Sequence, residues 1–183
     1  RELLMGDVNA AIAGCFDGGA SEVVVRDGHA TGCNFMPELL DRRAVLDRKS
    51  GPWTASLAES FDATMFVGVH AMAGTLNGFL DHTQNSRMWW RYSINGKPVG
   101  EIGQWATMAS HFKVPVVYVS GDEAGCREAE QLLPGVVTTA VKRGVGRNRA
   151  VGMHPSAAHD AIRRDAARAL ACGPRSFPKL IKW

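Results

Sequence analysis

The sequence predicts an α/β fold in which helices cover both faces of a largely parallel β-sheet, a three-layer αβα arrangement with one added β-hairpin. Apolar runs of strand length alternate with stretches that carry apolar residues at helical spacing, which is typical of such folds. The 183 residues, 45% of them hydrophobic, are enough for one core, and neither an internal repeat nor a linker is visible. We therefore expect one α/β domain over residues 1–183.

The first half of the chain is expected to contain two helices and two strands. Residues 2–16 carry apolar side chains at helical spacing, and Asp17-Gly18-Gly19 ends that helix. Residues 22–26 are a β-branched run typical of a buried strand. A short helix is expected at residues 54–61, and an apolar strand follows at residues 64–69.

The second half is expected to begin with a hairpin and then to alternate between helices and strands. Residues 88–94 and 97–99 flank Asn95-Gly96, a strong hairpin signal because both turn residues adopt positive φ. Amphipathic or apolar spacing then predicts the remaining elements: helices at 101–112, 122–133 and from 156 onward, and strands at 114–120 and 136–141.

Charge, hydropathy and cysteine spacing exclude several classes of protein. The formal net charge is only +3, too small to indicate a nucleic-acid partner. The apolar runs are far shorter than the ~20 residues of a membrane span, and the first seven residues do not resemble a signal peptide. We therefore expect no membrane partner. The four cysteines form no CxxC pair, so we expect a cytoplasmic protein with reduced thiols.

Polar side chains follow three of the expected strands at the point where each strand ends. His29 follows the first strand, His70 directly follows the second, and Asp122 follows the strand at 114–120. Because ligands bind outside the carboxyl ends of parallel strands, His29 and His70 are expected to converge. Neutral imidazole is a common zinc ligand, and Glu101 could add a carboxylate from the first turn of the next helix.

Each of these residues also has a purely structural interpretation. A histidine after a strand often only bonds to a backbone carbonyl, and Asp122 is more readily explained as a helix N-cap. His82 follows a glycine-containing loop, where its imidazole could act as a general acid or base or stabilise an oxyanion. It could equally be a solvated loop residue.

Two further groups of residues have more than one interpretation. A basic cluster is typical of a solvated face, although it could bind a substrate carboxylate or the acids of a neighbouring subunit. The members of this basic cluster are Lys142, Arg143, Arg147 and Arg149. Trp89-Trp90 indicates either packing within the hairpin or an interface.

Several ordered segments resemble the D-aminopeptidase family of zinc metallopeptidases, the DppA-like or M55 peptidases. The segments are residues 23–29 (VVVRDGH), 66–73 (FVGVHAMA), 94–101 (INGKPVGE), 114–116 (VPV), 120–122 (SGD) and 138–142 (TTAVK). The resemblance covers roughly residues 1–175. Because the segments occur in the family's order, the series is much more specific than any one of its motifs.

The resemblance implies a two-zinc site in which His29, His70 and Glu101 are metal ligands. It also implies that His82 acts in catalysis. In the family, a first strand carries an Asp-x-Glu-Gly motif whose acids also bind metal. Residues 1–5 match the helix after that strand, so the first strand, and the family's C-terminal part beyond about Lys179, are expected to be absent from this partial catalytic domain.

The function that the resemblance implies is that of a zinc-dependent aminopeptidase. Its substrates would be short peptides with a free N-terminus that contain D-amino acids, and it would form ring-like homo-oligomers. Two alternatives stay open on the sequence alone. One is another metal-dependent amidohydrolase on the same scaffold, since substrate choice depends on loops. The other is a catalytically inactive assembly or binding subunit.

Overall fold

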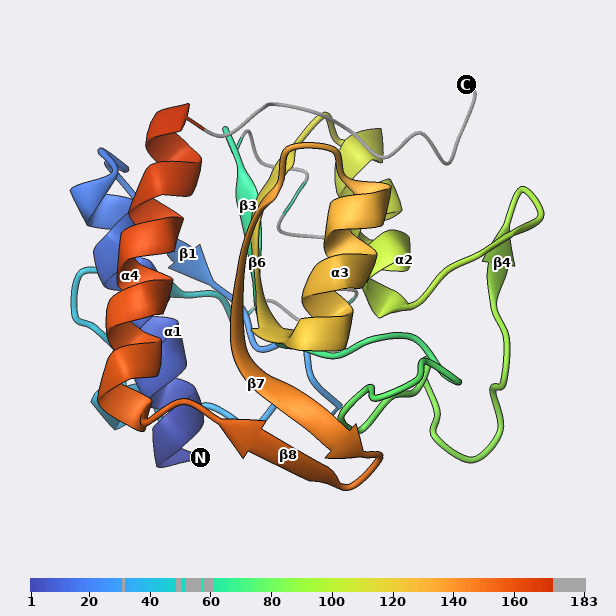
Figure 1. Ribbon diagram of the computed structural model, residues 1–183. Helices are drawn as coiled ribbons and strands as arrows, with labels where there is room; N and C mark the ends of the chain where they lie inside the picture. Colours follow the sequence, from blue (N-terminus) through green and yellow to red (C-terminus); the bar gives the residue numbers. More distant parts are fainter. Residues whose placement is uncertain (31, 49–50, 52–56, 58–60, 173–183) are drawn as a thin grey trace.

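Four strands form the central sheet in the computed structural model, which describes residues 1–30, 32–48, 51, 57 and 61–172. Their order is β3 (Thr64–Val69), β6 (Val116–Asp122), β7 (Val137–Gly146) and β8 (Arg149–Gly152). The first three strands run parallel, and β8 pairs antiparallel with β7 (Figure 1). The prediction of a largely parallel sheet is therefore confirmed.

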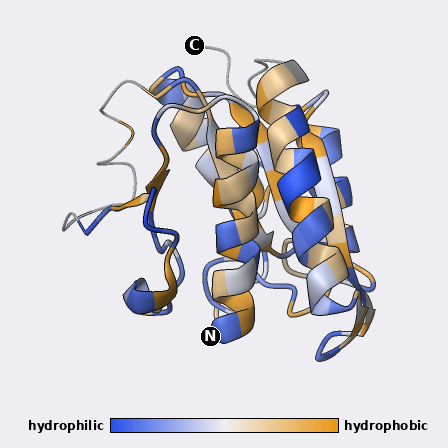
Figure 2. Ribbon diagram, turned by 90° about the vertical axis from the view of Figure 1, so that its left-hand side faces the viewer, coloured by the Kyte–Doolittle hydropathy of each residue, from blue (hydrophilic) through white to orange (hydrophobic). Residues whose placement is uncertain are grey.

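Two helices cover each face of this sheet, which confirms the three-layer arrangement. The helices α1 (Glu2–Asp17) and α4 (Pro155–Cys172) lie on one face, and α2 (Glu101–His111) and α3 (Glu123–Leu132) lie on the other (Figure 1). Figure 2 views the first face and shows α1 and α4 side by side. None of the described helices is both long and apolar enough to cross a membrane.

Small residues let α1 and α4 approach each other closely. Ala10, Ala11 and Ala166 are buried where the two helices pack over the sheet. A Cβ atom at Gly14 would lie 2.4 Å from the backbone oxygen of Arg163, so a larger residue at position 14 would push the helices apart. The small residues of both helices therefore allow α1 and α4 to pack tightly against each other and against the sheet.

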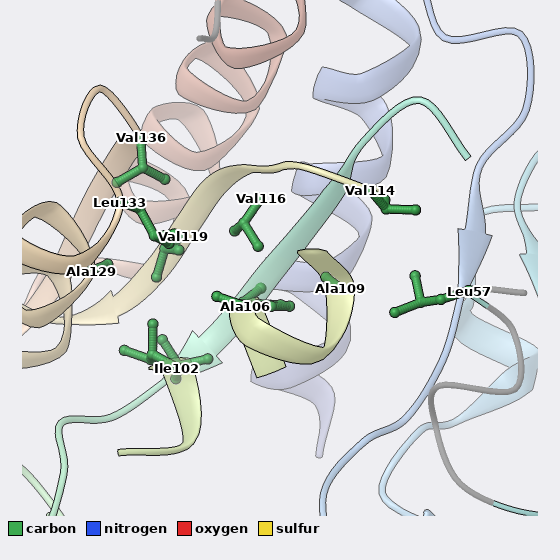
Figure 3. Close-up of a cluster of buried hydrophobic side chains, with 12 residues drawn as sticks. Leu57, Ile102, Ala106, Ala109, Val114, Val116, Val119, Ala129, Leu133 and Val136 are labelled. Atoms are coloured by element: carbon green, nitrogen blue, oxygen red, sulfur yellow. The ribbon is translucent and has the colours of Figure 1, made fainter. Parts of the chain in front are cut away.

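The other face of the sheet buries the main aliphatic core (Figure 3). All seven residues of β6 are buried, which explains why this strand appears in the sequence as an unbroken apolar run. Ile102 and Ala106 of α2 pack against Val119 of β6, together with Leu133 at the end of α3. This packing fixes the first turn of α2 close to the carboxyl ends of β3 and β6.

Two small sheets complete the described secondary structure. The strands β1 (Val24–Val25) and β2 (Val45–Leu46) pair in parallel, separately from the central sheet, and a 3₁₀ turn (Pro37–Leu39) lies between them in the chain. The strands β4 (Ser93–Ile94) and β5 (Lys97–Pro98) form the hairpin. Its turn residues have φ values of 50° and 78°, which confirms the predicted turn.

Most of the predicted elements are confirmed, with several differences in extent. The strands expected at 22–26 and 88–94 are each only two residues long, and β7 extends five residues beyond the predicted end at 141. The strands β2 and β8 were not predicted. The helix expected at residues 54–61 falls mostly outside the described residues.

Candidate metal centre

Three of the predicted site residues meet at one place near the carboxyl ends of β3 and β6. Nitrogen and oxygen atoms of His70, His82 and Glu101 lie within 4.8 Å of one another, the one such group of histidine, cysteine or acidic residues in the described part of the chain. Glu101 Oε1 lies 3.8 Å from His70 Nε2 and 3.5 Å from His82 Nε2. The two imidazole rings stack with their centroids 4.0 Å apart.

The positions of His70 and Glu101 follow from the packing of the sheet and of α2. His70 directly follows β3, and Gly121 of β6 lies against the residue before it: a Cβ atom at Gly121 would be 1.9 Å from Val69 O. Only glycine permits this approach. Glu101 is the first residue of α2, where the helix dipole favours a carboxylate. Glu101 Oε1 also accepts a hydrogen bond from the backbone amide of Gln84 at 2.9 Å.

Hydrogen bonds at several points hold the loop that carries His82. Within the loop, the Gly74 amide donates to Asp81 Oδ2 at 2.7 Å, and the Ala73 amide donates to Thr83 Oγ1 at 3.2 Å. From outside, the backbone oxygen of Arg147 accepts from the Leu80 amide at 2.7 Å. Hydrogen bonds therefore stabilise the loop internally and connect it to the β7–β8 hairpin.

Asp122 connects this loop to α3. The prediction that Asp122 is a helix N-cap is confirmed, because its Oδ1 accepts from the Gly125 amide at 3.0 Å. Its second oxygen, Oδ2, accepts from the Phe79 amide at 3.0 Å, a contact that the sequence did not indicate. Asp122 is fully buried, so both amides depend on it for a partner.

Replacing Asp122 by alanine is expected to lower the free energy of unfolding by about 2–4 kcal/mol, because one helix cap and one buried hydrogen bond are lost together. Urea denaturation measures the change. Glu123→Ala is the matched control, since Glu123 begins the same helix but only forms an ion pair with Arg127 at the surface. Equal stability of the two variants would contradict this account of Asp122.

Backbone carbonyls hold both histidines in the same tautomer. His70 Nδ1 lies 3.0 Å from Ala71 O, and His82 Nδ1 lies 2.8 Å from Leu80 O. A carbonyl oxygen only accepts hydrogen bonds, so the proton of each neutral ring sits on Nδ1 and the lone pair on Nε2. Burial lowers the pKa of His70, and the nearby His82 adds to this effect, whereas the Ala71 carbonyl, Glu101 and Asp122 oppose it.

The three side chains fit a divalent cation. Two Nε2 lone pairs and a carboxylate oxygen face one another, an arrangement that is repulsive unless a positive charge lies between them. Zinc takes nitrogen and oxygen ligands at about 2.0–2.2 Å, so neighbouring ligand atoms in a tetrahedral site are about 3.3–3.6 Å apart. The observed separations of 3.5 and 3.8 Å are close to that value.

His29 does not join this group. It is exposed in the loop after β1, and β1 pairs with β2 rather than with the central sheet, so its end does not share an edge with β3. Asp27 accepts hydrogen bonds from the backbone amides of His29 and Phe35, at 3.1 and 3.2 Å. Asp27 therefore shapes the loop backbone rather than orienting the His29 ring.

The basic cluster lies on the β7–β8 hairpin, beside the His82 loop. Arg147 Nε is 3.7 Å from Asp81 Oδ1, and Arg147 Nη2 donates to Ser86 O at 3.4 Å. The ammonium group of Lys142 lies 5.4 Å from the centre of the Phe79 ring. These two cations contact the loop itself, although the Arg147 side chain remains 56% exposed to solvent.

One acid close to the site was missed in the sequence. Glu128 lies on the buried face of α3, where helical spacing with Ala124 and Leu132 would favour an apolar side chain. A charged residue at such a position is the signal that could have identified it.

Histidine and glutamate side chains that could hold a metal ion gather near the carboxyl ends of parallel strands in an α/β domain, an arrangement that metal-dependent hydrolases use. The chain belongs to the D-aminopeptidase family of peptidases (family M55), whose sequence model matches residues 1–182. The resemblance seen in the sequence is therefore confirmed.

A sequence comparison and a structure comparison show the extent of the similarity. The chain is 35% identical over 173 residues to the D-aminopeptidase of Bacillus subtilis (strain 168), and the match covers 93% of this chain and 62% of that protein. Its fold is similar to a solved structure, the Zn-dependent D-aminopeptidase DppA from Bacillus subtilis, described as a self-compartmentalizing protease. That match has a TM-score of 0.89 and 32% identity, over 97% of this chain and 67% of the other.

Proposed function

We propose that this chain is the catalytic part of a zinc-dependent aminopeptidase that hydrolyses short peptides with a free N-terminus. The observation that supports the proposal best is that His70 Nε2 and His82 Nε2 lie 3.8 and 3.5 Å from the same atom, Glu101 Oε1. His70 and Glu101 would hold the metal. A zinc ion in such a site supplies a bound water with a pKa near 7, so that hydroxide is available at neutral pH.

His82 has the catalytic role in this proposal. The hydrogen bond from Nδ1 to Leu80 O fixes the ring, so that Nε2 faces the same space as Glu101. When protonated on Nε2, His82 would donate a hydrogen bond to the oxyanion that forms during hydrolysis, or a proton to the leaving amine. The loop contacts of Asp81 and Thr83 keep the ring in this position.

The finer features of the proposal come from the family and its relatives. We expect D-amino-acid-containing peptides as substrates and two zinc ions per subunit in the intact protein, with His29 contributing to the second ion. The names given to the Bacillus relative, D-aminopeptidase and Zn-dependent D-aminopeptidase, support the D-amino-acid substrates and the zinc, while the number of zinc ions and the role of His29 follow from the family resemblance. A cytoplasmic location is proposed too, supported by free thiols at Cys15 and Cys126.

Zinc analysis combined with peptide hydrolysis tests the proposed function. The wild-type protein should contain zinc and release D-alanine from D-Ala-D-Ala faster than L-alanine from L-Ala-L-Ala. His70→Ala should lose zinc and hydrolysis together, because one of the converging lone pairs is removed. His154→Ala, which alters a surface histidine whose ring is bonded to Ser156, should behave as the wild type. Unchanged activity in His70→Ala would contradict the mechanism.

We further propose that the segment 85–98 mediates assembly into ring-like homo-oligomers. This segment, which carries β4 and β5, projects from the body of the protein on the side of α2 and α3 (Figure 1). Met88 and Trp90 are 80% and 77% exposed, and Trp89 stacks on Tyr92 with 5.8 Å between ring centres. Exposed aromatic and methionine side chains are enriched at protein interfaces, and the related structure is described as self-compartmentalizing.

Trp90→Ser is expected to shift the protein toward smaller species in light scattering coupled to size-exclusion chromatography, because a large apolar contact is lost at the proposed interface. Leu3→Ser is the matched control. It removes an exposed apolar side chain from α1, which packs against α4 on the opposite face of the sheet. If both variants keep the wild-type mass, segment 85–98 is not the interface.

A further inference from the structure

We propose that Glu128 is a positioning residue for the metal centre, because its buried carboxylate holds together the two backbone segments that carry His70 and Glu101. The inference rests on the proposed zinc function. Glu128 itself touches neither of the two side chains that would hold the metal. It acts through the loop after β3 and through the residue that precedes α2.

Contacts on both carboxylate oxygens support this role. Glu128 Oε2 accepts a hydrogen bond from the Met72 amide at 2.7 Å, two residues after His70. Glu128 Oε1 lies against Gly100, the residue before Glu101: a Cβ atom at Gly100 would be 2.6 Å from Oε1. Among the described residues Oε1 has no hydrogen-bond partner, so Glu128 is joined to the Met72 segment by a hydrogen bond and to Gly100 by close packing.

The point where these segments meet leaves no room for a side chain at position 100. The same Cβ atom at Gly100 would also lie 2.7 Å from Met72 Cβ. Gly100, Met72 and the Glu128 carboxylate therefore pack in direct contact. A displacement of either backbone segment must move the carboxylate or break its hydrogen bond.

The surroundings of Glu128 make the burial of its carboxyl group costly for the stability of the fold. It is only 6% exposed, and among the ion pairs of the described residues none neutralises it. Burial raises its pKa to about 7, although the Met72 and Gly100 amides oppose this, and Asp122 and Glu101 raise it further. An apolar residue here would avoid the cost of burying an acid. A role at the metal centre explains why an acid occupies the position.

The consequence for the metal centre is geometric. His70 Nε2 and Glu101 Oε1 lie on different elements, 3.8 Å apart, and a shared ion tolerates only small changes in that separation. Groups that orient metal ligands without binding the metal typically change metal affinity by about 10–100-fold when they are removed. We therefore expect a change of that size when the Glu128 carboxylate is removed.

Zinc affinity, measured by competition with a chromogenic chelator, tests the inference without measuring enzyme activity. Glu128→Ala should weaken zinc binding by about 10-fold or more. Glu128→Gln should stay within about 3-fold of the wild type, because an amide oxygen can still accept from the Met72 amide. Asp165→Ala is the control for the loss of a buried acid. Asp165 accepts from Thr139 on the other side of the sheet, so this variant should lower Tm and leave zinc affinity unchanged.

A second variant tests the positioning role of Glu128 if Glu128→Ala does not fold. Gly100→Ala places a methyl group against Glu128 Oε1 and should also weaken zinc binding by about 10-fold. Wild-type affinity in Glu128→Ala, or in Gly100→Ala where the first variant is unfolded, would overturn the inference while leaving the proposed function intact. A wild-type protein that binds no zinc would instead overturn the proposed function, and the inference with it.

Discussion

Replacing His82 by alanine is expected to lower kcat for hydrolysis of a D-alanine peptide by about 10²–10³-fold, with zinc still bound at the wild-type stoichiometry. The imidazole is the one group of the three that the proposed mechanism assigns to the developing oxyanion and the leaving amine. His70 and Glu101 remain in place to hold the metal. A loss in kcat with little change in KM is the expected signature of an interaction that forms mainly in the transition state.

Metal analysis of the same His82→Ala variant separates two possible roles. The Nε2 atom of His82 is slightly closer to Glu101 Oε1 than that of His70, so the geometry also permits His82 to be a ligand. Loss of zinc in His82→Ala would show that it binds the metal and would contradict the catalytic role. His154→Ala provides the control, since it removes a surface imidazole far along the chain at the start of α4.

Glu101→Gln is expected to weaken zinc binding by at least about 100-fold and to abolish hydrolysis. Its Oε1 atom lies close to both Nε2 atoms, so removing the negative charge removes the attraction that holds a cation there. Glutamine keeps the size of the side chain and can still accept from the Gln84 amide. The fold should therefore remain intact, which a thermal unfolding measurement checks.

The matched control for Glu101→Gln is Glu123→Gln. Glu123 is likewise the first residue of a helix, and both variants lose the same interaction with a helix dipole. Glu123 pairs with Arg127 at 2.8 Å and takes no part in the metal centre. Zinc affinity should therefore be normal in Glu123→Gln. Equal zinc affinity in the two variants would mean that Glu101 is not a ligand.

The predictions of secondary structure succeeded where an element buries one continuous apolar face. The helix α1 and the strand β6 are such elements, since β6 is buried along its whole length. The prediction missed β8 because this edge strand is mostly exposed and therefore carries no apolar pattern. The hairpin turn was predicted because Asn95-Gly96 fixes the backbone locally, independent of what surrounds it.

The candidate site was only partly predictable from the sequence. His70 and Glu101 were identifiable because each lies at the end of a well-defined element, and both ends face the same edge of the sheet. His29 was expected beside them on the same reasoning. The structure instead places β1 in a separate pair with β2, so the end of β1 is not an end of the central sheet.

Local residue pattern indicated the helices and the longer strands of this protein and offered candidate donor side chains, and the family resemblance assigned their roles. Tertiary structure alone decided which donors meet. His82 lies beside Glu101 because the Asp122 side chain and the Arg147 backbone oxygen accept hydrogen bonds from its loop. Both residues are more than 40 positions away in the sequence from the loop amides that they contact. Glu128 reaches Met72 across 56 residues. Helical and strand periodicity describe neighbours within a few residues, so contacts made by separate elements appear only when those elements pack.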